Sequence, residues 1–344
     1  MTSDLRDRRP SRKRRRAGAF VVLSSGVLLA GCGKQSILQT HSPQAHNIAL
    51  LWWWMLGAAV IVFFGALTML AIGFFRRGTP GLPLFGEREE ISERMVLLFG
   101  IGIPAVVLVV LFGVSDVYLV GQTSPPSPQS TSMTIEVIGH QWWWEVRYPK
   151  SGARTANEIH IPTNTRVNVV ATTADVIHSF WVPALNRKID MIPGRRNRVL
   201  LYAARAGEYR GQCSQFCGLQ HANMALEVFA QPPAAFRRWL ANMSAPAPSA
   251  TAGQAQAGEK LFQTSQCASC HRIAGTSAQG TVGPDLTHVA SRSTLASATI
   301  PNTRAELTAW ISNPQAIKPG TRMPDLGLPR DKVNQLVAYL ERLQ

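Results

Sequence analysis

The chain has 344 residues, which allows two or three domains, and a formal net charge of +15. An excess of basic residues is one signal of nucleic-acid binding, but no basic helix with interleaved base-stacking residues is present in the sequence. Much of the charge lies in a basic run within residues 6–16, directly ahead of an apolar stretch. We therefore expect no nucleic-acid partner.

The N-terminus, residues 1–31, has the pattern of a bacterial signal peptide. The basic run is followed by the apolar stretch Ala17–Ala30, which is too short to span a membrane. The end of this stretch and the two residues after it, Leu29-Ala-Gly-Cys32, resemble a lipoprotein cleavage site. We therefore expect Cys32 to be lipidated and to become the N-terminus of the mature chain. The alternative is an ordinary signal peptide in which Cys32 is incidental.

Two long apolar segments predict a transmembrane hairpin over residues 45–120. The first helix, about residues 49–75, has no charged residue and carries three consecutive tryptophans typical of an interfacial belt. The second, about residues 95–120, has one charge, Asp116. Each is long enough to cross the ~30 Å hydrocarbon core. Four arginines in the connecting loop favour the cytoplasm, so both chain ends are expected outside the bacterial inner membrane.

Residues 121–132 are rich in serine and proline and indicate a linker. Residues 133–240 then contain several short segments of alternating pattern, which predict strands of a sandwich or barrel. These segments are residues 134–138, 165–170, 199–202 and 225–229. A second linker, rich in alanine, proline and serine, is expected at residues 241–256.

Five potential metal ligands lie within fifty positions of the β-rich segment: His178, Cys213, Cys217, His221 and Met224. Thiolate, thioether and imidazole groups together favour copper. A mononuclear blue-type copper needs only one cysteine, so the second thiolate indicates a dinuclear centre suited to electron transfer. A Cys-x3-Cys pair alone also suits a disulfide, a zinc half-site or a redox pair, although zinc rarely uses methionine.

A second redox motif lies near the C-terminus. Cys267-Ala-Ser-Cys270-His271 is the signature of covalent c-type haem attachment. The alternatives are a chance match or a zinc knuckle, but no second cysteine pair follows to complete a zinc site. A downstream methionine or histidine should be the other iron ligand. We favour Met323, which precedes a proline, and expect His288 to be a solvated loop residue.

The copper motif and its surroundings resemble subunit II of cytochrome c oxidase over about residues 45–240. The matching segments are Gly139-His-Gln-Trp-Trp-Trp144, Asp175-Val-Ile-His-Ser-Phe-Trp-Val-Pro183, Ile192-Pro-Gly-Arg195 and Gly211-Gln-Cys-Ser-Gln-Phe-Cys-Gly218. The resemblance implies a cupredoxin-like Greek key in residues 133–240. It assigns the five side chains named above, with the backbone carbonyl of Gln215, to a binuclear copper centre called CuA. Many members have glutamate at this position, where it also helps to hold magnesium, and Gln215 is a neutral, weaker magnesium ligand. The family places an electron-entry tryptophan after Gly-His-Gln, which here is Trp142.

Residues 257–344 resemble a class I cytochrome c, an all-α domain. The matching positions include Gly258, Phe262 and Gly283-Pro-Asp-Leu286. The resemblance implies that the carbonyl of Pro284 orients His271 and that Met323 is the distal ligand. Apolar residues at helical spacing over residues 330–343 predict a last helix that packs against the first helix of this domain.

Together, the resemblances imply a subunit II of a caa-type haem-copper oxidase with a fused cytochrome c. Electrons would enter a haem c held by His271, pass to the copper pair near Trp142, and leave by way of His221 towards subunit I. Oxygen reduction and proton pumping would occur in subunit I, so this chain is an enzyme subunit without catalytic residues of its own. The expected partners are subunits I and III, the membrane, and an external cytochrome c or another reduced donor.

Three alternatives have different sequence signatures. A quinol oxidase subunit II keeps the fold but lacks the copper ligands that Cys213 and Cys217 supply here. A nitrous-oxide reductase, another terminal reductase with a CuA domain, shares the copper motif. The two membrane spans of this chain, and its lack of that enzyme's catalytic-domain histidines, argue against this reading. A membrane-tethered copper chaperone would have its histidine after the cysteine pair in an α/β pattern, whereas His178 precedes the pair in a β-rich segment.

Overall fold

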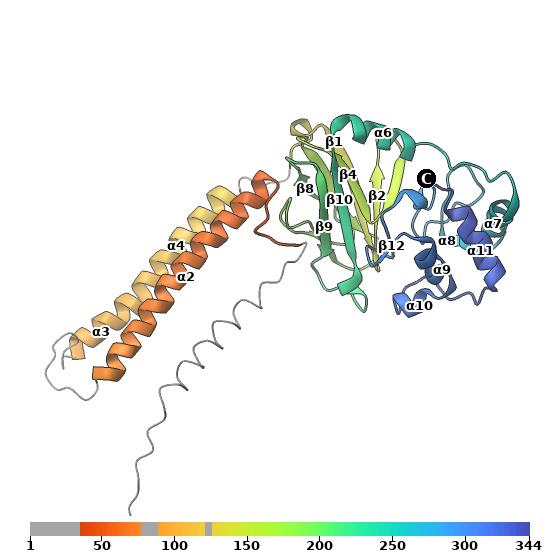
Figure 1. Cartoon of the computed structure of the whole chain (residues 1–344). Coiled ribbons are helices and arrows are strands. Elements are labelled where there is room, and N and C mark those ends of the chain that lie inside the picture. Colours follow the sequence, from red (N-terminus) through yellow and green to blue (C-terminus); the bar gives the residue numbers. More distant parts are fainter. Residues whose placement is uncertain (1–34, 77–88, 121–125) are drawn as a thin grey trace, which may run out of the picture.

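The computed structural model describes residues 35–76, 89–120 and 126–344. Figure 1 shows a helical hairpin that projects from a β domain, and a helical C-terminal domain that packs on the other side of the β domain. The predicted signal peptide at residues 1–31 and the predicted lipidation site Cys32 lie outside the described residues. The three parts follow the predicted order of membrane helices, β domain and cytochrome-like domain.

Two helical segments form the hairpin. The first is α2 (Pro43–Arg76), and the second runs without interruption through α3 (Glu89–Leu97), η1 (Leu98–Gly102), α4 (Ile103–Ser115) and η2 (Asp116–Val120). Both are long and apolar enough to cross a membrane, with mean hydropathies of 2.4 over Pro43–Phe75 and 2.9 over Glu93–Ser115. Most of their large apolar side chains are exposed, which suits a surface that faces lipid.

The first helix begins six residues before its predicted start, because a polar cap extends it beyond the apolar stretch. The Ser42 hydroxyl accepts a hydrogen bond from the backbone N–H of Ala45 at 3.1 Å, and Pro43 occupies the first helical position. The same hydroxyl donates to the carbonyl of Leu185 in the β domain at 2.5 Å. The cap therefore also attaches the hairpin to the β domain.

The β domain consists of two five-stranded sheets with orders β3-β2-β1-β5-β8 and β4-β10-β9-β6-β7. The strands are β1 (Met133–His140), β2 (Trp143–Tyr148), β3 (Ala153–Ala156), β4 (Glu158–Pro162), β5 (Val167–Thr173), β6 (His178–Trp181), β7 (Ile189–Met191), β8 (Asn197–Leu201), β9 (Gly207–Cys213) and β10 (Ala225–Gln231). The four predicted strands are confirmed as β1, β5, β8 and β10. The inward side chains of the two sheets form one core, which includes Ile135, Trp144, Phe180 and Leu226.

The C-terminal domain is built around two crossing helices, α7 (Gly253–Thr264) and α11 (Arg330–Leu340). The shorter elements are α8 (Cys267–Cys270), η5 (Val289–Ser291), β11 (Thr294–Leu295), β12 (Ile300–Pro301), α9 (Arg304–Ser312) and α10 (Pro314–Ile317). The predicted apolar stripe of the last helix is buried against Phe262 of α7. A Cβ at Gly258 would lie only 1.9 Å from the carbonyl oxygen of Gln335, so the helices approach closely where the side chain is smallest.

Helix α6 (Pro233–Met243) closes the β domain, and the connection to α7 lies along the C-terminal domain. The N–H of Ala247 donates to the carbonyl of Ala274 at 3.0 Å. His288 lies beside the same connection with 2% of its surface exposed, so the prediction of a solvated His288 is wrong. Its ring nitrogens lie 2.7 Å from the carbonyl oxygen of Gln344 and 3.0 Å from that of Ala245, which explains the burial.

Candidate functional site

The predicted copper ligands converge at one end of the β domain. His178 begins β6, Cys213 ends the neighbouring β9, and the loop from β9 to β10 supplies Cys217, His221 and Met224. The two Sγ atoms are 3.9 Å apart. Nδ1 of His178 lies 3.9 Å from the Sγ of Cys213. Nδ1 of His221 and Sδ of Met224 lie 3.6 and 3.8 Å from the Sγ of Cys217.

These contacts fit a shared metal site. A disulfide has an S–S length of about 2.05 Å, so the pair at 3.9 Å is not bonded. The backbone carbonyl of Gln215 lies 3.2 Å from the Sγ of Cys213, which brings the predicted carbonyl ligand to the same place. The cysteines, Met224 and His178 are buried. Soft sulfur and imidazole donors grouped in this way are those that copper prefers.

His178 is held in one orientation by Asp175, a residue for which the sequence predicted no role. Nε2 of His178 lies 2.8 Å from the Asp175 carboxylate, which leaves Nδ1 facing Cys213. The other carboxylate oxygen accepts the N–H of Gln141 at 2.7 Å. Burial raises the pKa of Asp175, but hydrogen bonds from His178 and two backbone N–H groups outweigh it and lower the pKa to about 2. A carboxylate behind a ligating histidine is a common way to fix its ring.

The two thiols influence each other in the absence of metal. A hydrogen bond from Cys217 lowers the pKa of Cys213 to about 4, against the effect of burial. The Cys213 neighbour and burial both raise the pKa of Cys217. A metal binds to deprotonated thiols, so its binding to both sulfurs would release any proton that the pair holds.

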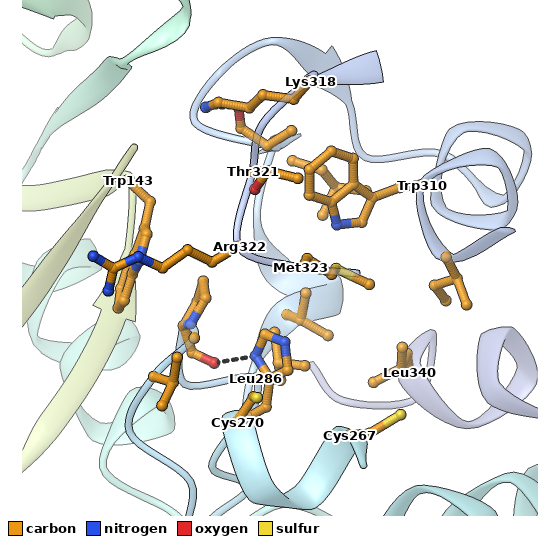
Figure 2. A pocket seen from close by; sticks show the side chains of 18 of the residues that line it. Trp143, Cys267, Cys270, Leu286, Trp310, Lys318, Thr321, Arg322, Met323 and Leu340 are labelled. Atoms are coloured by element: carbon orange, nitrogen blue, oxygen red, sulfur yellow. Dashed lines mark hydrogen bonds between the residues drawn. The ribbon is translucent and has the colours of Figure 1, made fainter. Parts of the chain in front are cut away.

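The predicted haem ligands line a cavity of about 250 Å³ between α7, α9 and the segment that follows α10. Figure 2 shows Met323 across this cavity from Cys267 and Cys270. Nδ1 of His271 lies 2.8 Å from the carbonyl oxygen of Pro284, as the resemblance implied, and Nε2 is left as the nitrogen available to iron. Burial lowers the pKa of His271, which favours the neutral imidazole that a metal requires.

The cavity also has the polar and steric features that a haem requires. Arg292 is buried in its wall, and its Nε has no hydrogen-bond partner within the part of the chain that the structure describes. An anionic group of a ligand would pair with this guanidinium. A Cβ at Gly283 would lie 2.5 Å from Cε1 of His271, so a residue with a side chain at this position would clash with the imidazole. The residues present therefore fit a haem.

Trp142 contacts both sites. Its Nε1 donates to the carbonyl of Cys217 at 3.0 Å, and Nε2 of Gln141 donates to the same oxygen at 2.8 Å. Trp142 is also one of the residues that line the cavity of the C-terminal domain. Trp142 lies in the turn before β2, and Trp143 begins that strand and stacks on His140 with ring centroids 4.2 Å apart.

Comparison with known proteins agrees with this division. Residues 153–230 match the family model for the periplasmic domain of cytochrome c oxidase subunit II, and residues 255–344 match that for cytochrome c. Cytochrome c oxidase subunit 2 of Alkalihalophilus pseudofirmus is 30% identical over 340 residues, which cover 95% of this chain and 97% of the relative. The chain belongs to the cytochrome c oxidase subunit 2 family. The subunit 2 of Bacillus subtilis is 29% identical, over 92% of this chain and 95% of the relative.

Among solved structures, the periplasmic domain of subunit II from Bradyrhizobium japonicum is similar. It is 34% identical and covers 34% of this chain and 95% of that domain, with a TM-score of 0.33. As a subunit 2, the chain is part of a haem-copper oxidase, an oxidoreductase complex, and it has an electron-transfer role. The two matched domains imply copper and haem, and the protein is a membrane protein with periplasmic domains. The copper-chaperone alternative is thereby set aside.

Proposed function

We propose that this subunit II takes electrons at a covalently bound haem c and passes them through a binuclear CuA centre to subunit I. In this proposal, Cys267 and Cys270 would attach the haem through thioether bonds, and His271 and Met323 would ligate its iron. When bound, the haem and the copper pair would supply one-electron redox chemistry. The residues of this chain orient the ligands of both redox groups and exclude water from them.

Six donors are proposed to hold the copper pair: His178, Cys213, the carbonyl of Gln215, Cys217, His221 and Met224. The buried side chains of His178, Cys213, Cys217 and Met224 would exclude water, and Asp175 keeps the His178 ring in place. His221 is less buried than His178 and is proposed as the exit towards subunit I. Because donors approach the two sulfurs from several sides, the arrangement suits electron transfer better than substrate binding.

The position of Trp142 carries the proposal. Its indole is hydrogen-bonded to the carbonyl of Cys217, and Trp142 is also one of the residues that line the predicted haem cavity. One residue therefore borders the surroundings of both redox sites. This supports Trp142 as the point at which electrons enter the copper site.

We propose a two-pass topology in the inner membrane, with both redox domains on the periplasmic side and Cys32 lipidated. Subunits I and III are the proposed partners in the membrane. An external cytochrome c or another reduced donor is proposed to supply electrons. Oxygen reduction and proton pumping are assigned to subunit I.

Metal analysis and optical spectra of the purified oxidase test this function. We expect two coppers and one haem c per copy of this chain, with a c-type haem spectrum and a near-infrared mixed-valence copper band. Cys217→Ser should abolish only the copper band. The reciprocal control, Cys270→Ala, should alter haem attachment and leave the copper band unchanged. A single copper, zinc, or a disulfide between Cys213 and Cys217 would refute the proposal.

A further inference from the structure

A buried lysine joins the two redox domains. Lys318 has 2% of its surface exposed, although lysine is almost never fully buried unless it is paired. Its Nζ lies 2.8 Å from the carbonyl oxygens of both Trp142 and Asn223 in the β domain, and 3.0 Å from that of Ala296 in the C-terminal domain. An ammonium group has three hydrogens, so each hydrogen has one carbonyl acceptor.

Lys318 differs from a surface lysine in its pKa and in the position of its hydrogen-bond partners. Burial lowers the pKa of Lys318 to about 7, whereas three carbonyl acceptors favour the protonated form. Trp142 is the proposed electron-entry residue, and Asn223 directly precedes the proposed copper ligand Met224. The lysine therefore binds the backbone directly beside the copper site.

The residues after Lys318 continue the contact as far as Arg322, which directly precedes Met323. Nε2 of Gln220 donates to the carbonyl of Pro319 at 2.7 Å. A Cβ at Gly320 would lie 2.8 Å from a methyl of Leu219, so the Leu219 side chain packs directly on the Gly320 backbone. Arg322, which extends towards the β domain in Figure 2, pairs with the Asp175 carboxylate at 3.7 Å. The segment that presents the proposed haem ligand is thus also the segment seated on the copper loops.

The hairpin of β11 and β12 forms a second set of interdomain bonds. The Ser297 hydroxyl donates to the carbonyl of Ala225 at 2.8 Å, and the N–H of Ala225 donates to the carbonyl of Ser297 at 3.3 Å. The Ser293 hydroxyl bonds to the carboxylates of Glu158 and Glu227 at 2.8 and 2.7 Å. These carboxylates are buried and come from paired strands. Directional bonds to buried partners define one relative orientation, unlike a loose apolar contact.

We propose that Lys318 is a positioning residue that fixes the cytochrome domain on the copper domain in a single docked arrangement. This inference rests on the proposed function. Electrons then pass between the two sites without waiting for a tethered domain to diffuse into contact. A hydrogen bond to a charged group changes an equilibrium by roughly tenfold to a hundredfold, so loss of Lys318 should lower the docked-to-undocked ratio by about that factor.

The test is a flash-reduction experiment on the purified oxidase, in which a photoexcited ruthenium complex reduces the haem and absorbance follows transfer to copper. For the native chain, we expect a rate that does not change with glycerol viscosity. Lys318→Met should slow the transfer and make the rate viscosity-dependent, with unchanged haem and copper spectra. Lys260→Met, which removes the charge of an exposed lysine of the same domain, should match the native chain.

Two results would overturn the inference. One is a native rate that falls as viscosity rises, which requires no variant and decides the question even if Lys318→Met loses its cofactors. The other is a correctly loaded Lys318→Met protein with the native rate and no viscosity dependence. A native protein that shows no transfer from haem to copper at all would instead refute the proposed function, so the two failures are distinguishable.

Discussion

The close crossing of α7 and α11 makes Gly258→Ala a demanding test of the haem domain. On an exposed helical face, this substitution stabilises a helix by about 1 kcal/mol. At Gly258, the new methyl would lie 1.9 Å from the carbonyl oxygen of Gln335 and 3.0 Å from the Cβ of Tyr339, where ordinary contact begins at 3.4 Å. The new methyl would meet the backbone of α11 and not a flexible side chain, so α7 and α11 would have to move apart. Overpacking costs about 1–3 kcal/mol, and since a backbone clash belongs at or above the upper limit, we expect a net loss of about 2 kcal/mol.

Urea unfolding followed by the visible haem absorbance would measure this loss, because the haem signal reports the cytochrome domain rather than the whole chain. Gln256→Ala, at an exposed position of the same helix, is the matched control and should change the free energy of unfolding by less than about 0.5 kcal/mol. If Gly258→Ala unfolds at the same or a higher urea concentration than the native chain, helix propensity dominates and the reasoning from close packing is wrong.

Two further predictions concern the copper domain and the haem ligands. Burial alone raises the pKa of Glu145, but hydrogen bonds from His140 and Arg147 outweigh it and lower the pKa to about 2. Because a lowered pKa stabilises the fold only while the carboxylate is charged, Glu145→Gln should cost roughly 1 kcal/mol at pH 7 and progressively less as the pH falls from about 4.5 to 2, measured by denaturant titration at each pH. Met323→Ala should change the absorption spectrum of the haem and lower the reduction potential of the haem. His288→Ala should leave both unchanged and cost about 1–3 kcal/mol of stability, and a spectral change in His288→Ala alone would contradict the ligand assignment.

The local parts of the structure were predictable from the sequence. Alternating segments identified β1, β5, β8 and β10, and long apolar runs identified both helices of the hairpin, because each pattern reflects which face of one element is buried. The five predicted donor side chains lie together in the structure, because four of them belong to one loop and its flanks. The helix start at Pro43 was missed because the apolar stretch, and not the Ser42 cap, was used to place it.

Long-range contacts could not be read from local patterns. Lys318 bonds to a carbonyl 176 positions away, and a basic residue in a polar loop gives no sign of such a partner. A polar residue in a loop is usually solvated, which is why the sequence predicts an exposed His288, whereas its ring lies between the carbonyl oxygens of Gln344 and Ala245. Asp175 had a recognisable signal, an acid three positions before a ligating histidine, but its role became clear only from the bond to Nε2.

The junction between α2 and the β domain has a consequence for the whole assembly. His41 donates its N–H to the carbonyl of Ala184 at 2.8 Å and accepts the N–H of Ala204 at 3.0 Å, directly before the Ser42 cap. The chain is therefore hydrogen-bonded to the β domain up to the start of its first apolar helix. This junction sets how far the copper domain lies from the beginning of that helix. Lengthening the serine- and proline-rich connection after the second helix would leave this distance unchanged.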